Sequence, residues 1–280
     1  MNCLKKRLIY SALICNLFFC FGVRAQDIAA TFDLANQMKD EGNYDAAIKL
    51  YQRVNFFGNG YKSSECLLQT ADVYFKLNEY DKAAEYYDYA YSSVHDDSLH
   101  NLISLSKAVI FIYQKKYLES LQELFSVTDD EFFMRTKNIY LATTYYGLNK
   151  FEECKAVLFE LEKDSIEKIQ LAKLISKAEK IQKRNPNTAK VLSMIIPGLG
   201  QFYAGDIRDG LNSLIISSAF MYLGINTALQ YSFIEATSVV PWFARYYMGG
   251  YNHAKIIMEN RIEEKQFSIY QQILKIIETE

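Results

Sequence analysis

The sequence predicts an all-α protein in which an α-solenoid of helical repeats is followed by a helical membrane hairpin. Apolar and small residues recur at the period of a helix-turn-helix unit between residues 26 and 163. Glycine and proline, at 12 and 3 residues of 280, are too scarce for a loop-rich β fold. Farther along, the run from Gly210 to Tyr231 contains no charged residue and is long enough to cross a bilayer as a helix.

The composition argues against nucleic-acid binding and against catalysis. The formal net charge is -2, so the chain lacks the basic excess that nucleic-acid binding requires. Only three histidines are present, and the sequence contains no nucleophile–base pair, cluster of metal ligands or nucleotide-binding loop. We therefore expect a protein that is not an enzyme, without catalytic residues, cofactor, metal site or nucleic-acid partner.

Two cysteines lie in the body of the chain. Cys66 and Cys154 belong to different predicted repeats, and neither is part of a CxxC pair. We expect both to be separately packed thiols rather than a disulfide.

Residues 1–25 have the three parts of a secretory signal peptide. Basic residues at 5–7 precede the apolar run 8–21, and the small residues in 23–25 precede a cleavage site at Gln26. An uncleaved anchor is the alternative, although the apolar run is short for a membrane span. Either interpretation exports the following domain across the inner membrane of a bacterium and places it in the periplasm.

Five columns of residues keep their phase through about four copies of a repeat that covers residues 26–163. The copies align on an aromatic residue, at spacings of 34 to 37 residues. Small residues stand nine positions before and three after it, large residues stand six before it, and tyrosine or leucine stands seven after it. The aligned aromatics are Tyr44, Tyr80, Tyr117 and Phe151; the small residues include Ala35, Ala71, Ala108, Ala142, Ala47 and Ala83; and the large ones include Tyr74 and Tyr145.

This pattern resembles the tetratricopeptide repeat, a helix-turn-helix unit of about 34 residues. In that family, small residues let the two helices approach closely and the aromatic fills the wedge between them. Gly42 and Asn78 stand where the first helix of a unit is expected to end. The family's terminal proline is missing from all four copies, and Lys107 occupies a usually apolar position. The resemblance implies a stacked array that binds proteins or peptides.

The sequence does not define which face of the array binds a partner. Tyr86, Tyr89 and Tyr91 can form an aromatic binding surface, or they can pack between repeats with their hydroxyls in water. We expect the partners to be other envelope proteins or peptides.

A capping helix and a linker are predicted for residues 164–187. Ile166, Leu171 and Ile175 have the spacing of one helix face, which we expect to cover the last repeat. Pro186 then ends this helix.

Residues 188–261 are predicted to form a membrane-embedded helical domain. Its glycine-rich turn contains Pro197, Gly198, Gly200, Gln201, Tyr203 and Gly205. These residues resemble the P-G-x-G-Q-x-Y-x-G signature of small two-helix bacterial membrane domains, some of which follow tetratricopeptide arrays in envelope proteins. Arg245 and Gly249 are similar to part of that family's second-helix pattern. The resemblance implies contact with membrane lipid, but no defined biochemical role.

The sequence leaves the environment of two charged residues open. If Glu235 and Arg245 lie in the hydrocarbon core, they are expected to pair. Pro241 favours the alternative, an interfacial loop over 233–240 that keeps both charges near lipid headgroups. A helical bundle outside any membrane is a further alternative. The positive charges of 177–190 also favour a cytoplasmic location, which conflicts with export of the array.

The last predicted element is an amphipathic helix that ends the chain at 262–280. Isoleucines follow one side of the stretch that leads into and through it, at Ile256, Ile262, Ile269, Ile273 and Ile277. Its partner can be the membrane surface, the array or a second copy, so a homo-oligomer is one possible assembly.

Together these features predict a non-enzymatic scaffold or adaptor of the bacterial cell envelope. The hairpin would hold it in the inner membrane, and the array would face the periplasm and bind other proteins. The alternative is a transport or channel-like component, whose C-terminal helices do the work while the array recruits partners. The small number of polar residues available to line a path counts against that alternative.

Overall fold

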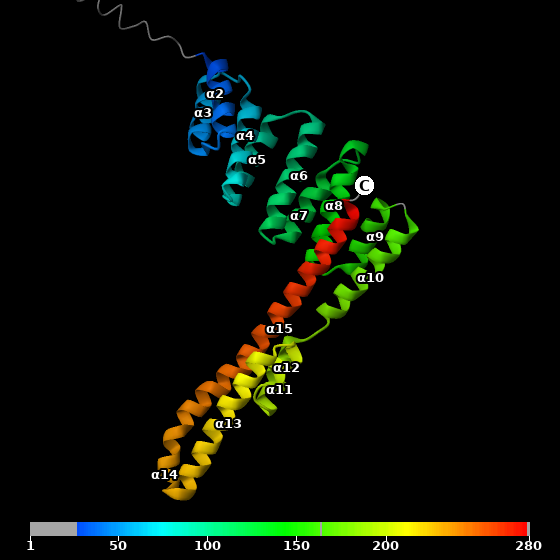
Figure 1. Cartoon of the computed structure of the whole chain (residues 1–280). Helices are drawn as coiled ribbons and strands as arrows, with labels where there is room; N and C mark the ends of the chain where they lie inside the picture. The colour runs from blue at the N-terminus through cyan, green and yellow to red at the C-terminus, as the bar shows by residue number, and fades with distance from the viewer. Residues whose placement is uncertain (1–26, 163, 279–280) are drawn as a thin grey trace, which may run out of the picture. The chain divides into compact units, whose positions relative to one another are not determined.

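The structure, a computed structural model, describes residues 27–162 and 164–278 (Figure 1). These residues form helices joined by short turns, and none of them lies in a strand. The predicted all-α fold is confirmed. The predicted signal peptide lies outside the described residues. The chain divides into two compact units between Tyr140 and Leu141.

The first unit is a succession of antiparallel helix pairs (Figure 1). From α2 to α7, each helix packs on its partner within the pair, and the pairs pack on one another in chain order. The helices are α2 (Ile28–Asp40), α3 (Tyr44–Phe57), α4 (Ser63–Lys76), α5 (Tyr80–Ser93), α6 (Asp97–Tyr113), α7 (Tyr117–Ser126) and the first part of α8 (Glu131–Gly147). Such sequential packing is what a repeating helix-turn-helix unit produces.

The turn inside each helix pair has one recurring geometry. A residue two positions before the aligned aromatic adopts a left-handed conformation, and the next N–H donates to the carbonyl oxygen five residues earlier. This is the Schellman way of ending a helix. The left-handed residues are Gly42, Asn78, Lys115 and Asn149. The predicted helix ends at Gly42 and Asn78 are therefore confirmed, and the aligned aromatics begin α3, α5, α7 and α9.

The small residues of the columns lie in the core. Ala35, Ala47, Ala71, Ala83 and Ala108 are completely buried. Because these positions carry only a methyl group, the two helices of a pair approach closely, and the larger side chains of the same columns pack around the contact. The aromatics Tyr44, Tyr74, Tyr80 and Tyr117 are partly buried.

The second unit begins inside α8 and continues through shorter helices into a long hairpin. Its elements are α9 (Phe151–Leu161), α10 (Ser165–Gln182), α11 (Pro186–Ile195), α12 (Leu199–Ala204), α13 (Ile207–Gln230), α14 (Phe233–Ala236), the 3₁₀ turn η1 (Thr237–Val239) and α15 (Val240–Ile277). Ala142 and Phe151 are buried and Tyr145 is partly buried. The predicted break at Pro186 occurs, but the chain resumes at once as α11, with Asn185 capping its N-terminus.

α15 is one continuous helix of 38 residues. It covers both the predicted second helix of the membrane hairpin and the predicted terminal amphipathic helix. Its C-terminal half packs against α10, and Ile269, Ile273 and Ile277 are buried there. Ile256 is exposed instead, so the predicted isoleucine face does not extend that far toward the N-terminus.

Gln266 shows how this half of α15 is held. Its backbone carbonyl and its side-chain oxygen accept hydrogen bonds from the Tyr146 hydroxyl of α8, at 2.9 and 2.6 Å. Its side-chain nitrogen donates to the Ala178 carbonyl of α10 at 2.9 Å. Of the partners considered for the terminal helix, the array is the one that it contacts within this unit, through Tyr146 of α8. It also packs on α10, the predicted capping helix.

α13 and the first half of α15 lie side by side as an antiparallel hairpin, joined by α14 and η1 (Figure 1). By length and hydropathy together, none of the helices in the described part of the chain qualifies as a membrane span. The membrane location of the hairpin stays a prediction.

Candidate functional site

Gln201 is the buried centre of the glycine-rich turn. Its side-chain oxygen accepts a hydrogen bond from the Ser193 hydroxyl of α11 at 2.7 Å, and its nitrogen donates to the Gly250 carbonyl of α15 at 2.9 Å. The Ser193 hydroxyl also accepts from the N–H of Gly200, at 2.9 Å. One amide side chain thus joins α11, α12 and α15 and fixes the base of the hairpin.

Two glycines of the turn are required by close approach. A Cβ atom on Gly200 would lie 1.8 Å from the Ala189 carbonyl oxygen, so α11 and α12 can pack only if this side chain is a hydrogen. Gly198 has a φ of +92°, and its Cβ would lie 2.3 Å from the Gly210 carbonyl oxygen. The signature therefore encodes a tightly packed structural turn.

The other residues of the signature are spread over the same region. Pro197 is in the turn before α12, and Gly205 ends α12 in a left-handed conformation. Tyr203 is exposed. Arg245 and Gly249 lie on α15, where they line a cleft rather than the turn.

A cleft of about 350 Å³ with both polar and apolar lining, called the polar cleft below for its polar side chains, lies between α13 and α15. Its polar lining comprises Gln201 from α12, Asp209, Asn212, Ser213 and Ser217 from α13, and Arg245, Tyr246 and His253 from α15. His253 Nδ1 is 3.4 Å from an Asp209 carboxylate oxygen, an ion pair when the imidazole is protonated. Arg245 is exposed and forms no ion pair within residues 27–162 and 164–278, with Glu235 or any other acid. The cleft thus presents one positive charge that the protein does not neutralise by a direct contact.

An open apolar groove of about 370 Å³, called the apolar cavity below, lies farther along the same helix pair. Phe220, Met221, Gly224 and Ile225 of α13 line it, together with Val240 and Phe243 of α15 and residues of the connection between them. Thr237 is the one residue with a polar side chain in this lining. The ring of Phe220 stacks on that of Tyr246, with centroids 5.2 Å apart. Since Tyr246 lines the polar cleft, the two cavities meet at this aromatic pair.

The outer surface of the hairpin is unusually apolar. Ile215, Met221, Leu229, Phe233 and Ile234 have exposed fractions between 61% and 82%. Further exposed apolar side chains follow α13 and the start of α15, among them Leu223, Ile225, Val240 and Trp242. A contiguous apolar surface of this kind marks a membrane or protein contact in folded proteins.

In the first unit, a polar contact recurs that the sequence analysis missed. The hydroxyl of Tyr51 donates to the Asn36 side chain at 2.7 Å, and the hydroxyl of Tyr87 donates to the Asp72 carboxylate. Both tyrosines belong to the fifth repeat column. The sequence does contain a signal for this contact: in both pairs, an amide or acid residue precedes the tyrosine by 15 positions.

The three tyrosines considered as a binding surface have different environments. Tyr86 packs on Tyr74, and its hydroxyl accepts a hydrogen bond from Gln52, so it joins neighbouring helix pairs. Tyr89 and Tyr91 are 51% and 39% exposed. The aromatic surface that remains accessible is therefore smaller than the sequence suggested.

Lys107, the polar residue at a usually apolar repeat position, is largely buried between two acids. Its Nζ lies 2.7 Å from Asp88 on α5 and 2.5 Å from Glu123 on α7. Burial lowers the pKa of Lys107, but the hydrogen bonds to both acids outweigh burial and leave the pKa raised. The lysine is therefore charged and joins three helices.

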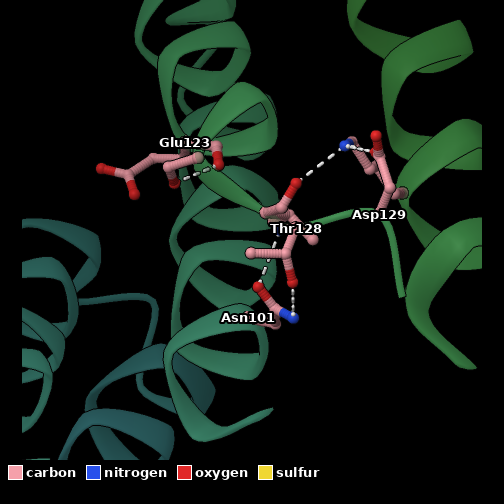
Figure 2. Close-up of polar contacts among 7 residues, drawn as sticks. Asn101, Glu123, Thr128 and Asp129 are labelled. Carbon is pink, nitrogen blue, oxygen red and sulfur yellow. Dashed lines mark hydrogen bonds and ion pairs between the residues drawn. The ribbon is translucent and has the colours of Figure 1, made fainter. Parts of the chain in front are cut away.

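A second polar network fixes the connection between α7 and α8. Figure 2 shows Asn101 and Thr128 joined by two hydrogen bonds, from the Asn101 amide to the Thr128 hydroxyl and from the Thr128 N–H to the Asn101 oxygen. Lys137, which is almost completely buried, donates to the Val127 carbonyl at 2.8 Å and to the Asp129 carboxylate at 2.9 Å. Every polar group of this network has a partner, which indicates a structural role.

The two body cysteines are free and buried. Burial raises the pKa of Cys66 to about 11 and that of Cys154 to about 12. Both side chains are neutral thiols near pH 7, which makes them poor nucleophiles and poor metal ligands.

No model of a protein family matches this chain, and no curated protein matches its sequence.

Proposed function

We propose that this protein is a non-enzymatic scaffold of the bacterial cell envelope. In this proposal, the α13–α15 hairpin is embedded in the inner membrane, and a solenoid of tetratricopeptide-like repeats faces the periplasm and binds other envelope proteins. The apolar surface of the hairpin is the observation that carries the proposal.

The energies favour insertion of the hairpin. Burying one large apolar side chain stabilises by about 1.5–3 kcal/mol, so half a dozen of the exposed ones are worth about 10 kcal/mol. Glu235 and Arg245 oppose insertion by about 3 kcal/mol each at the bilayer centre, and by less near headgroups. The apolar contribution exceeds the cost of both charges.

The helix pairs support the scaffold part of the proposal. Their core positions hold small residues and their turns repeat one geometry, as in arrays that bind proteins or peptides. Tyr89 and Tyr91 offer exposed aromatic surface on α5, and aromatic side chains are enriched at protein interfaces.

One observation favours the alternative of a transport component. The polar cleft of Asp209, Arg245 and His253 lies at the base of the proposed membrane hairpin, and ionisable residues in membrane proteins often have a function. However, the cavity that adjoins it toward the end of the hairpin is almost entirely apolar. An ion or polar solute would find few partners there, so the scaffold is the better-supported function.

The membrane anchor can be tested with a full-length variant. Leu229, Phe233, Ile234 and Trp242 are all more than half exposed, so replacing them with serine removes apolar surface without opening a core. We expect the wild-type chain to stay in carbonate-washed membranes and the variant with all four serine substitutions to be released from them. Truncation after Arg184 is a poorer test, because it removes the part of α15 that packs on α10.

A double variant in the first unit tests whether the array binds other proteins. Tyr89→Ser with Tyr91→Ser should leave membrane attachment unchanged and reduce cross-linking to envelope proteins in intact cells. Extraction of the wild-type chain by carbonate would contradict the anchor. Unchanged cross-links in the tyrosine variant would contradict binding through this face of the array.

A further inference from the structure

The seam between α13 and α15 changes character along its length. On α13, Asp209, Ser213, Ser217, Phe220 and Gly224 follow one another at steps of three or four residues, which places them on one face of the helix. The first three line the polar cleft and the last two line the apolar cavity. One continuous seam is thus polar at the base of the hairpin and apolar toward its end.

In the polar part of the seam, one charged residue has a partner of opposite charge and another has none in the part of the chain that the structure describes. Asp209 has His253 as a partner at 3.4 Å, whereas Arg245 is exposed and contacts no acid in the described residues. Ser213 and Ser217 lie in the same cleft and offer hydroxyl groups. A guanidinium with nearby hydroxyls is suited to a phosphate oxygen, to which arginine donates strong, charge-assisted hydrogen bonds.

The order of the side chains along the seam fits an amphiphile. Arg245 is the chain neighbour of Tyr246, whose ring stacks on Phe220 where the polar cleft adjoins the apolar cavity. A molecule with a phosphate at Arg245 and a chain directed past Phe220 would therefore match the chemistry of the seam.

We infer that the α13–α15 seam is a binding site for one phospholipid, with its phosphodiester on Arg245 and an acyl chain in the apolar cavity. This inference rests on the proposed membrane location, which supplies the ligand. It gives the cleft a role in holding a specific lipid rather than in moving a solute.

Two variants and one control separate the contributions of the phosphate group and of the acyl chain to binding. Arg245→Gln removes the positive charge, and Arg208→Gln removes an exposed positive charge of α13 that does not line the cleft. Gly224→Leu fills the apolar cavity; a Cβ at this position meets only Val239, at 3.9 Å, so the helix accepts it. Leucine also has a higher helix propensity than glycine, so a loss of folding is not expected.

The measurement is native mass spectrometry of the full chain in detergent, titrated with dioleoylphosphatidylglycerol. We expect one bound lipid in the wild type and in Arg208→Gln, and about tenfold weaker binding in Arg245→Gln and in Gly224→Leu, the loss of one charged hydrogen bond or of one chain contact. Dioleoylglycerol, which lacks the phosphate, should bind the wild type no better than the phospholipid binds Arg245→Gln.

Three results would overturn the site. The first is an Arg245→Gln variant that binds the lipid with wild-type affinity, and the second is an Arg208→Gln variant that loses as much lipid affinity as Arg245→Gln. The third is inorganic phosphate that binds as tightly as the lipid, which would indicate an anion site that does not hold an acyl chain. Carbonate extraction of the same variants keeps the two proposals apart. Arg245→Gln should remain in the membrane, since its apolar surface is intact, and release of the wild-type chain would count against the anchor alone.

Discussion

The hydroxyl of Tyr87 donates a hydrogen bond to the carboxylate of Asp72, and so links the two helices of the second pair, α4 and α5. In the first pair, Tyr51 makes the same contact with Asn36. The two helix pairs therefore form the same tyrosine contact, with a carboxylate as the acceptor in the second pair and an amide oxygen in the first. Burial raises the pKa of Asp72, and its bond with Tyr87 and the charges of Lys39 and Lys76 offset burial only in part.

We predict that Asp72→Asn stabilises the first unit. Because the folded pKa of Asp72 is raised, the ionised carboxylate costs stability above that pKa, and the cost disappears as the pH falls toward the usual value of about 3.9. The gain should be about 1 kcal/mol at neutral pH and close to zero in acid. Urea denaturation of the full chain at both pH values checks this, with hydrogen exchange in α4 and α5 to locate the effect. The converse change, Asn36→Asp, should be destabilising at neutral pH; stabilisation by it would contradict the argument.

Lys107 provides a second prediction, on buried charge. Replacing it with methionine removes the partner of Glu123, whose side chain is 19% exposed, whereas Asp88 is 61% exposed and can be hydrated. We expect Lys107→Met to destabilise by about 1–2 kcal/mol and Asp88→Asn by less than about 0.5 kcal/mol. Chemical denaturation of both variants tests the ranking, and a larger effect of Asp88→Asn would show that the exposed pair dominates.

The features that could be predicted from sequence are the local ones. The left-handed residues Gly42 and Asn78 and the helix starts at Tyr44 and Tyr80 depend on contacts within one helix pair, which the repeat columns display. Lys115 takes the same conformation without the glycine or asparagine that would have signalled it. The residue type therefore gave no indication of the turn at this position.

The features that could not be predicted depend on pairing between distant segments. Nothing in the local pattern of α15 indicates that Gln266 would bond to Tyr146 and Ala178, more than 80 residues away. Likewise, the environment of Arg245 depends on the rotation of α15 against α13. The sequence singles out Arg245 as a charged residue in a predicted membrane segment. The cleft that it lines, however, exists only once α15 packs against α13.

The cysteines give a prediction about reactivity. With pKa values raised to about 11 and about 12, Cys66 and Cys154 should resist alkylation near pH 8 in the folded chain and react in concentrated urea. The unfolded thiols ionise at about pH 8.5, below the folded ones, so the stability of the fold should fall as the pH rises above that value. Iodoacetamide labelling followed by peptide mapping measures both sites, and rapid labelling of native Cys154 would contradict its burial.

The glycines of the signature give the sharpest contrast. In Gly200→Ala the new Cβ would lie 1.8 Å from the Ala189 carbonyl oxygen, a backbone atom that cannot move without separating α11 from α12. The same separation would break the bond from the Gly200 N–H to Ser193, on which Gln201 depends. Overpacking of this kind costs about 3 kcal/mol or more.

Gly249→Ala is the matched control, since no atom lies within 4 Å of its added Cβ and the residue is inside α15. Alanine there should be neutral or stabilising by up to about 1 kcal/mol, through helix propensity. Thermal unfolding of the second unit in the full chain compares the two. If Gly200→Ala unfolded at the wild-type temperature, the tight approach of α11 to α12 would be wrong, and with it the reason for a glycine at the centre of the turn.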